Sequence, residues 1–178
     1  TRKPAVVRAV ARAGVSLQAW KAELIRSRTA VAEALTADTG RRALSYAEVD
    51  VITAAIDRWC RVAPELLEPP ARRTSEMPGI ELGWTAAPYP VVAVIAPWNF
   101  PLVLTLIDAV PALAAGCAVL AKASKVTPRF VEPLSETIER VPELAKVLRM
   151  IRGSGRIGSV MIEYADAVCF TGSIPVGR

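Results

Sequence analysis

Two polar side chains stand directly beside apolar runs of this sequence, at positions where they could do chemistry. Asn99 lies in the rigid turn Pro97-Trp-Asn-Phe-Pro101, where a neutral amide can donate a hydrogen bond to a developing oxyanion. Lys122 ends the apolar run AVLAK. Burying an unpaired ammonium is costly, so we expect Lys122 to reach a cleft and meet an anion or a sugar hydroxyl. The alternatives are that Asn99 caps the next helix and that Lys122 is an edge lysine extending to solvent.

Two glycine-containing segments also follow apolar runs. The first is Gly153-Ser-Gly155-Arg-Ile-Gly158, whose bare backbone N–H groups could face a phosphate at the start of a helix. Such glycine clusters are weakly specific, and a tight strand-to-helix turn is an equal alternative. The second is Phe170-Thr-Gly-Ser173, with Gly177 shortly after it. Its small residue and two hydroxyls again suit contact with a phosphate.

The elements that must position these residues alternate between strand and helix from residue 91 onward. Continuous apolar runs predict strands at 91–96, 118–122, 148–151 and 167–170. Helical spacing predicts helices at 101–115, 127–140 and 156–164, with a short helical turn at 142–147. Thr127-Pro128 is the expected start of the second of these helices. This order predicts a parallel sheet with right-handed crossovers, with ligands beyond the carboxyl ends of its strands.

The first part of the chain is predicted to be helical. Apolar residues at helical spacing predict a helix over 5–37, and Gly40 is its expected stop; those residues are Val6, Val10, Leu17, Trp20, Leu24, Val31 and Leu35. Ser45 and Glu48 form a capping-box pattern that predicts the start of a second helix, which Pro64 should end. A surface connection and a short strand at 81–85 should follow. We therefore expect an α/β fold: a Rossmann-like parallel sheet with flanking helices, preceded by N-terminal helices and a short β segment.

Composition excludes several classes of chemistry. The 178 residues contain no histidine, so a Ser-His-Asp triad, a Cys-His pair and a histidine-bearing zinc site are impossible within them. Three separated cysteines, with no CxxC pattern, are expected to be free thiols in a reducing compartment. No charged-then-apolar leader opens the chain, so we expect a cytoplasmic protein. The formal charge of +5 comes without a basic stripe, so nucleic-acid binding is not expected. No metal site is expected either, because histidine, the commonest transition-metal ligand, is absent.

One stretch raises the question of a membrane span. Between Val91 and Ala121 the only charged residue is Asp108. A stretch of that length could cross a bilayer. Three internal prolines argue for strand, turn, helix and strand instead, and no membrane partner is expected. The membrane alternative predicts a protein that needs detergent to stay in solution.

The combined motifs resemble the aldehyde dehydrogenase superfamily. They are PWNFP at 97–101 preceded by VVAVIA, then Lys122-Ala-Ser-Lys125-x-Thr-Pro128, then Phe170-Thr-Gly-Ser173, in the family's order and nearly its spacing. The resemblance covers residues 78–178; before them only the helical layout and Asp38-Thr-Gly40-Arg41 are similar. It implies an N-terminal helical region at 1–77 and part of an NAD(P)-binding Rossmann-like domain at 78–178.

The resemblance also implies roles for single residues. Asn99 matches the family's oxyanion-hole asparagine, which would be the catalytic residue of this chain. Lys122 matches the lysine that hydrogen-bonds the adenosine ribose. The remaining matches surround the cofactor: Ala96, Pro97 and Trp98 along the nicotinamide, Gly155 and Gly158 on the adenine side, and Phe170, Gly172 and Ser173 beside the pyrophosphate.

One departure from the family concerns the choice between NAD and NADP. Many members have a glutamate three residues after the cleft lysine, where it binds the ribose 2′-hydroxyl and disfavours a 2′-phosphate. This chain has Lys125 there. A cation at that position could pair with the phosphate of NADP, so we expect NADP to be accepted at least as well as NAD.

A second departure concerns the nucleophile. The family's catalytic cysteine and its glutamate base lie downstream of the Phe-Thr-Gly-Ser motif, whereas Cys60, Cys117 and Cys169 lie upstream of that position. We therefore expect the cofactor-binding part of an enzyme that oxidises an aldehyde to a carboxylic acid, inactive alone. The alternative is a non-catalytic nucleotide-binding or assembly module derived from the family.

The expected partners are an aldehyde in the full enzyme and a further polypeptide surface. The strand at 167–170 would be an apolar sheet edge, which invites aggregation unless another chain covers it. Relatives commonly form dimers or tetramers through a hairpin, half of which 81–92 could supply. A homo-oligomer or a complementing chain is therefore expected.

Overall fold

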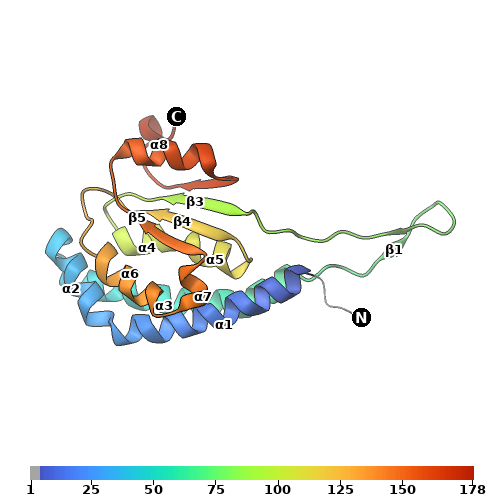
Figure 1. Ribbon diagram of the computed structural model, residues 1–178, viewed down its shortest axis with the longest axis horizontal. Coiled ribbons are helices and arrows are strands. Elements are labelled where there is room, and N and C mark those ends of the chain that lie inside the picture. The colour runs from blue at the N-terminus through green and yellow to red at the C-terminus, as the bar shows by residue number, and fades with distance from the viewer. Residues whose placement is uncertain (1–4) are drawn as a thin grey trace.

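A four-stranded parallel sheet forms the centre of the protein. The computed structural model describes the backbone of residues 5–178 and the side chains from residue 12 onward. The strands are β3 (Val91–Ile95), β4 (Ala118–Lys122), β5 (Leu148–Ile151) and β6 (Ala167–Phe170). They lie in the order β5-β4-β3-β6, and each neighbouring pair is parallel. The predicted α/β class with a Rossmann-like sheet is confirmed (Figure 1).

Helices connect the strands and cover the sheet. They are α4 (Pro101–Leu106), α5 (Ala109–Ala114), α6 (Val131–Glu139), α7 (Pro142–Ala145), α8 (Gly155–Tyr164) and α9 (Ile174–Gly177). The chain moves from β3 to β4 to β5 through α4–α7, and then α8 carries it back to β6 on the other side of β3. Because parallel crossovers are right-handed, α8 lies on the opposite face from α4–α7. The order of the strands therefore reverses between β3 and β6.

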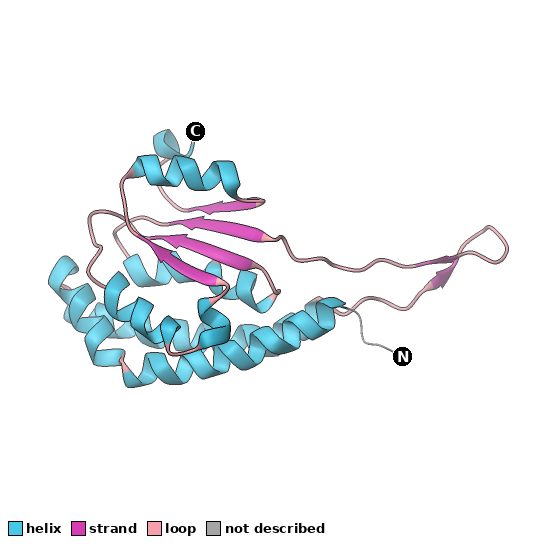
Figure 2. Cartoon of the chain, viewed as in Figure 1, coloured by secondary structure: helices cyan, strands magenta, loops and turns pink. Residues whose placement is uncertain are grey.

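Three N-terminal helices form a further layer. They are α1 (Ala5–Arg26), α2 (Arg28–Thr39) and α3 (Arg42–Leu66), and they pack against α4–α7 (Figure 2). One cluster of buried apolar side chains runs from these helices to the sheet. Its largest fully buried members include Trp20, Leu24, Ile52, Leu102, Phe130 and Leu134. The side chains of Val6 and Val10 lie outside the described residues.

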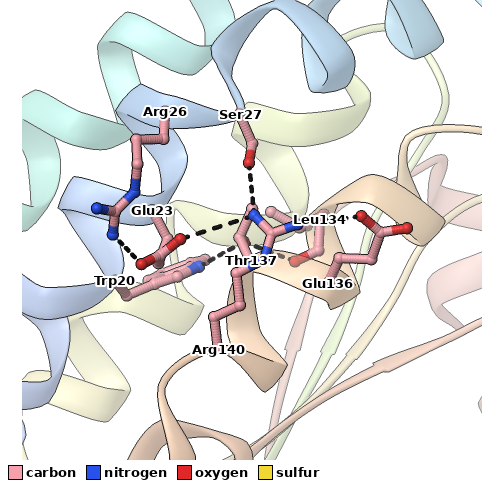
Figure 3. Close-up of polar contacts among 8 residues, drawn as sticks. All are labelled: Trp20, Glu23, Arg26, Ser27, Leu134, Glu136, Thr137 and Arg140. Carbon is pink, nitrogen blue, oxygen red and sulfur yellow. Dashed lines mark hydrogen bonds and ion pairs between the residues drawn. The ribbon is translucent and has the colours of Figure 1, made fainter.

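A small polar network fixes α1 against α6. The indole Nε1 of Trp20 donates to Thr137 Oγ1 at 2.8 Å, and that hydroxyl donates to the Leu134 carbonyl at 2.7 Å. Arg140 lies beside this pair, at the end of α6, and its guanidinium points toward both helices (Figure 3). Its partners there are Ser27, Glu23 and Glu136. A buried indole N–H needs such a partner, and this hydrogen bond joins the two helices.

A narrow arm projects from the body (Figure 1). Its only regular part is the pairing of β1 (Arg73–Thr74) with β2 (Glu81–Leu82), which is antiparallel. The predicted strand over 81–85 is therefore shorter than expected. Gly79 has φ of +78° in the turn, a conformation that favours glycine. Large apolar side chains are exposed along the arm: Met77, Ile80, Leu82, Trp84 and Tyr89.

Two predicted helices are each divided in the structure. The helix expected over 5–37 breaks at Ser27, whose φ and ψ of −94° and 9° end α1 before α2 begins. The helix expected over 101–115 breaks at Ile107–Asp108. Pro111 explains the second break, because its ring lacks an N–H and collides with the carbonyl four residues earlier, that of Ile107.

Two predicted helix starts are wrong. Ser45 does not cap α3, which begins a full turn earlier because Gly40, in the left-handed conformation, ends α2. The Ser45 hydroxyl instead donates to the Arg41 carbonyl at 3.0 Å. Thr127 does not cap α6 either, since that helix begins at Val131. The helix that Pro64 should end continues to Leu66, because the missing N–H of a proline so close to the helix end removes only one bond.

The apolar stretch 91–121 is confirmed as strand, helix and strand. In the part of the chain that the structure describes, no helix is long and apolar enough to cross a membrane.

Candidate functional site

The carboxyl ends of the four strands form one straight row. Ile95 of β3 is in register with Lys122 of β4 and with Phe170 of β6, and Lys122 is in register with Ile151 of β5. Adjacent strands of a sheet lie about 4.8 Å apart, so these residues span only about 15 Å. The loops that follow them therefore open onto the same edge. The crevice of such a sheet lies where the strand order reverses, here between β3 and β6.

Lys122 is the buried cation of this edge. It is only 5% exposed, and its strand is interior to the sheet, so it is not the edge lysine considered above. Its Nζ donates to the Ala123 carbonyl at 3.3 Å. Burial lowers the pKa of this ammonium below its ordinary value. An ammonium has three donors, so Lys122 keeps donor capacity for a further acceptor.

Gly158 of α8 lies directly over the Lys122 side chain. A Cβ added at Gly158 would be 3.5 Å from Ile95 Cδ1 and 3.7 Å from Lys122 Cδ. These are ordinary van der Waals distances, so α8 packs directly on the ends of β3 and β4 at this glycine. Gly155 begins α8 and has open space around its Cα. Sequence reasoning grouped these two glycines, but only Gly158 contacts the lysine.

The loop after β4 holds Lys125 and Thr127. Lys125 is exposed and makes no ion pair within the described residues. Thr127 is 2% exposed, and its buried Oγ1 has no hydrogen-bond partner among residues 12–178. The loop is fixed from α2: Asp38 accepts a hydrogen bond from the Arg129 backbone N–H at 2.8 Å and from its guanidinium at 2.9 Å.

The loop before α8 needs one glycine for its backbone. Gly153 has φ of +149°, and a Cβ there would lie 2.6 Å from Ile157 Cγ1. Both facts exclude a side chain at Gly153. The segment forms a tight turn from β5 into α8, and this turn presents the first turn of α8 to the strand-end edge.

The Phe170 ring organises the loop after β6. A Cβ added at Gly172 would lie 2.5 Å from Phe170 Cζ, and one added at Gly177 would lie 2.9 Å from Cε1. The ring thus rests on two glycines, and Ser173 directly precedes α9. The Thr171 N–H donates to the Ile95 carbonyl at 3.0 Å, which extends the β3–β6 pairing by one bond.

Asn99 lies in an exposed turn between β3 and α4. Trp98 is 56% exposed beside it, whereas Ala96 and Pro97 are less exposed. The Asn99 side chain does not cap α4, as the alternative proposed: the cap residue is Phe100, without a side-chain cap bond. The Asn99 amide makes no hydrogen bond to the described part of the chain.

Two charged residues of the α2–α3 region hold this turn, and sequence reasoning missed both roles. Glu48 is 3% exposed, and its Oε2 accepts from the N–H groups of Leu102 and Val103 at 2.9 and 3.0 Å. The Arg41 guanidinium donates to the Asn99 carbonyl and lies 5.0 Å from the centre of the Phe100 ring. The available signal was the spacing of Glu48 from Ile52 and Ile56, which places a carboxylate on the buried face of α3.

None of the three cysteines has the lowered pKa of an activated thiol. Burial raises the pKa of Cys60, Cys117 and Cys169, the opposite of what an activated thiolate requires. Cys117 precedes β4 and so lies at the other end of the sheet from Lys122. Within residues 12–178, no group of three or more Asp, Glu or Cys side chains could hold a metal ion.

Comparison with known proteins matches this fold to one family. The chain resembles a protein assigned as aldehyde dehydrogenase PutA from Anabaena variabilis, with 45% identity and a TM-score of 0.89 over 97% of this chain and 38% of that one. A betaine aldehyde dehydrogenase from Staphylococcus aureus, solved with NAD+, is 29% identical with a TM-score of 0.84 over 97% of this chain and 37% of its own.

Sequence relatives agree with the structural ones. A Mycobacterium tuberculosis protein assigned as succinate-semialdehyde dehydrogenase (NADP+) 2 is 30% identical over 99% of this chain and 33% of its own length. The chain thus spans about a third of the length of the curated relatives it matches. The family model described as aldehyde dehydrogenase family matches residues 7–178. The chain belongs to the aldehyde dehydrogenase family.

Proposed function

We propose that this chain is the cofactor-binding part of an NAD(P)-dependent aldehyde dehydrogenase, which oxidises an aldehyde to a carboxylic acid. The observation that carries the proposal is the shared strand-end edge, where the buried Lys122 ammonium and the open Asn99 turn follow neighbouring, in-register strands. The division into a helical region at 1–77 and a cofactor-binding region at 78–178 is part of this proposal.

Lys122 is the proposed anchor of the dinucleotide. The residues present fit such a group: within the described residues, Lys122 Nζ has one acceptor and Thr127 Oγ1 in the following loop has no hydrogen-bond partner. A ribose supplies hydroxyls to such an ammonium. The other proposed contacts are Ala96, Pro97 and Trp98 along the nicotinamide, Gly155 and Gly158 near the adenine, and Phe170, Gly172 and Ser173 near the pyrophosphate.

Asn99 is the proposed oxyanion donor. When bound, the dinucleotide supplies the acceptor for the hydride that leaves the substrate. The role of Asn99 is to donate its side-chain N–H to the substrate oxygen as negative charge develops there. An amide already oriented by its turn reorganises little during the reaction, and the free amide of Asn99 suits that role.

The nucleophile is proposed to lie outside these 178 residues. Burial raises the pKa of each of the three thiols here, whereas an activated cysteine has a lowered pKa. We therefore expect this chain alone to produce no NAD(P)H from an aldehyde.

The proposed partners cover two apolar surfaces. Val168 and Phe170 on the last strand of the sheet are 39% and 37% exposed, and the arm carries exposed Trp84 and Tyr89. We propose that a further part of the enzyme covers the β6 edge and that the arm contacts another copy in a homo-oligomer. The cytoplasm is the proposed compartment.

Dinucleotide titration of the full-length protein and of this chain, with and without an aldehyde, tests the proposal. Binding by both, with aldehyde-dependent NAD(P)H formation only by the full-length protein, is the expected result. Binding without turnover in the full-length protein would favour the non-catalytic nucleotide-binding module instead. Absence of dinucleotide binding in the full-length protein would contradict both.

A further inference from the structure

The helix α3 reaches the Asn99 turn with a buried carboxylate. Glu48 accepts two hydrogen bonds on the same oxygen, from the N–H groups of Leu102 and Val103. These two groups belong to the first turn of α4, where backbone N–H groups lack partners within the helix. The third such position is Pro101, which has no N–H to satisfy. Glu48 therefore serves the start of α4 from a position 54 residues away.

A hydrogen bond from a neighbouring cap residue would not tie the turn to the core of the protein. The cap residue Phe100 contributes no side-chain hydrogen bond. A carboxylate bound to backbone N–H groups at a helix start makes charge-assisted bonds, which are stronger than neutral ones. Because the carboxylate comes from α3, which is packed in the core through Val49, Ile52 and Ile56, the first turn of α4 is fixed to a rigid element.

Arg41 holds the other side of the same turn. Its guanidinium donates to the Asn99 carbonyl and lies over the Phe100 ring. Arg41 directly precedes α3, so the same element fixes the turn at the carbonyl of residue 99 and at the N–H of residue 102. The Asn99 side chain branches from the backbone directly before the first of these two fixed points and is itself unbonded within the described chain.

The carboxyl group of Glu48 is shielded from solvent, since the residue is only 3% exposed. Burial raises its pKa, which its two backbone partners and the nearby charge of Arg41 oppose. The bonded Oε2 faces only backbone N–H donors, which cannot accept a proton.

We propose that Glu48 is a positioning residue for Asn99. By binding the first turn of α4, and together with Arg41, it sets where the Asn99 amide stands at the strand-end edge. The inference rests on the proposed function, in which that amide donates to the substrate oxygen.

A double-mutant cycle in the full-length protein tests the inference. Asn99→Ala should lower kcat by about 10²–10³-fold, as loss of an oxyanion donor does. Glu48→Ala should lower kcat by about tenfold or more and leave the dinucleotide Kd within about twofold. The double variant should match Asn99→Ala alone, because Glu48 acts through Asn99. Multiplied single effects, or a Glu48→Ala kcat within about twofold of wild type, would overturn the inference.

Two further variants separate positioning from stability. Glu48→Gln keeps an acceptor oxygen and should restore most of the kcat lost in Glu48→Ala. Thr137→Val destabilises the protein far from the turn and should leave kcat unchanged. If Thr137→Val lowers kcat as Glu48→Ala does, the loss reflects stability and the inference fails.

Amide hydrogen exchange gives a measurement that does not depend on turnover. In Glu48→Ala, exchange at Leu102 and Val103 should rise by about tenfold or more, while exchange in α6 stays unchanged; Thr137→Val should show the reverse. Unchanged exchange at residues 102 and 103 would overturn the inference even in an active enzyme. An inactive wild type that binds no dinucleotide would instead overturn the proposed function, and the exchange data would still decide whether Glu48 holds the turn.

Discussion

Trp20 and Thr137 are 117 residues apart in sequence and are joined by a buried hydrogen bond of 2.8 Å. The bond links the first helix of the chain to the helix between β4 and β5. It shows how strongly the N-terminal helices are integrated with the sheet region.

Replacing Thr137 with valine should destabilise the protein by about 1–3 kcal/mol. The two side chains have nearly the same shape, but valine leaves the buried Trp20 N–H without an acceptor. Urea denaturation of both proteins would measure the difference. Ser135→Ala is the matched control, because that hydroxyl bonds only the Val131 carbonyl of its own helix. Equal unfolding midpoints for wild type and Thr137→Val would contradict the prediction.

Gly153 and Gly155 should respond differently to alanine. Gly153→Ala should cost about 1–3 kcal/mol, because Gly153 combines a positive φ with a collision against Ile157. Gly155→Ala should be neutral or slightly stabilising, since its Cβ would meet no atom within 4 Å. Thermal unfolding of the two variants checks the contrast, and similar losses in both would refute it.

Gly158 should tolerate alanine and reject valine. An alanine Cβ would stand at ordinary contact distance from Ile95 and Lys122, and alanine favours a helix over glycine by about 1 kcal/mol. The branched side chain of valine would displace the lysine stem. We expect Gly158→Ala to keep stability and dinucleotide affinity, and Gly158→Val to lower the affinity. Calorimetric titration compares the dinucleotide affinities of the two variants. Equal affinities would contradict the proposal that α8 lies close to the bound dinucleotide.

Lys122→Met should raise stability while weakening dinucleotide binding. Burial lowers the pKa of Lys122, so the charged ammonium opposes folding below that pKa. This opposition disappears as the pH rises through the folded-state pKa toward the ordinary value. The stability gained in Lys122→Met should therefore be largest near neutral pH and shrink at alkaline pH. Chemical denaturation at pH 7 and pH 10 measures it, and a gain independent of pH would contradict the charge argument.

Lys125→Glu should change cofactor preference. An exposed cation can pair with the 2′-phosphate of NADP, whereas a carboxylate repels it and can bind the 2′-hydroxyl of NAD. We expect NADP affinity relative to NAD to fall by about tenfold or more. Titration of both dinucleotides into wild type and variant measures this preference. Lys146→Glu, on the α7–β5 connection, is the control for the change in net charge. An unchanged NADP preference would contradict the hypothesis.

The strands were the most predictable elements. β4, β5 and β6 have the bounds expected from the sequence, because strands buried in a parallel sheet are short, continuous apolar runs. Helix ends were less predictable. Ser45 and Glu48 match a capping box, yet the structure uses them separately, since the Glu48 carboxylate binds Leu102 and Val103. A local pattern cannot reveal a partner 54 positions away.

The candidate site was likewise only partly predictable from the sequence. The sequence placed Asn99, Lys122 and Phe170 at strand ends, and the register puts Lys122 and Phe170 in one row with Ile95, four residues before Asn99. The sequence did not reveal what holds the loops, because Asp38 and Arg41 look like ordinary surface charges and Glu48 matches a local capping box. Only the packing of α2 and α3 over the sheet region brings them to those loops.

Three contacts from α2 and α3 thus secure the loops of the strand-end edge: Asp38 with Arg129, Arg41 with Asn99, and Glu48 with Leu102. The arm lies between the two members of every pair. A hybrid gene made by joining two family members anywhere between residues 49 and 98 would take one member of each pair from each parent. The partners at Asn99 and Leu102 are backbone groups that either parent supplies, whereas Asp38 and Arg129 both contribute side chains. Parents that differ at residue 38 or 129 should therefore yield misaligned hybrids, and for such parents productive crossovers should fall before residue 38 or after residue 129.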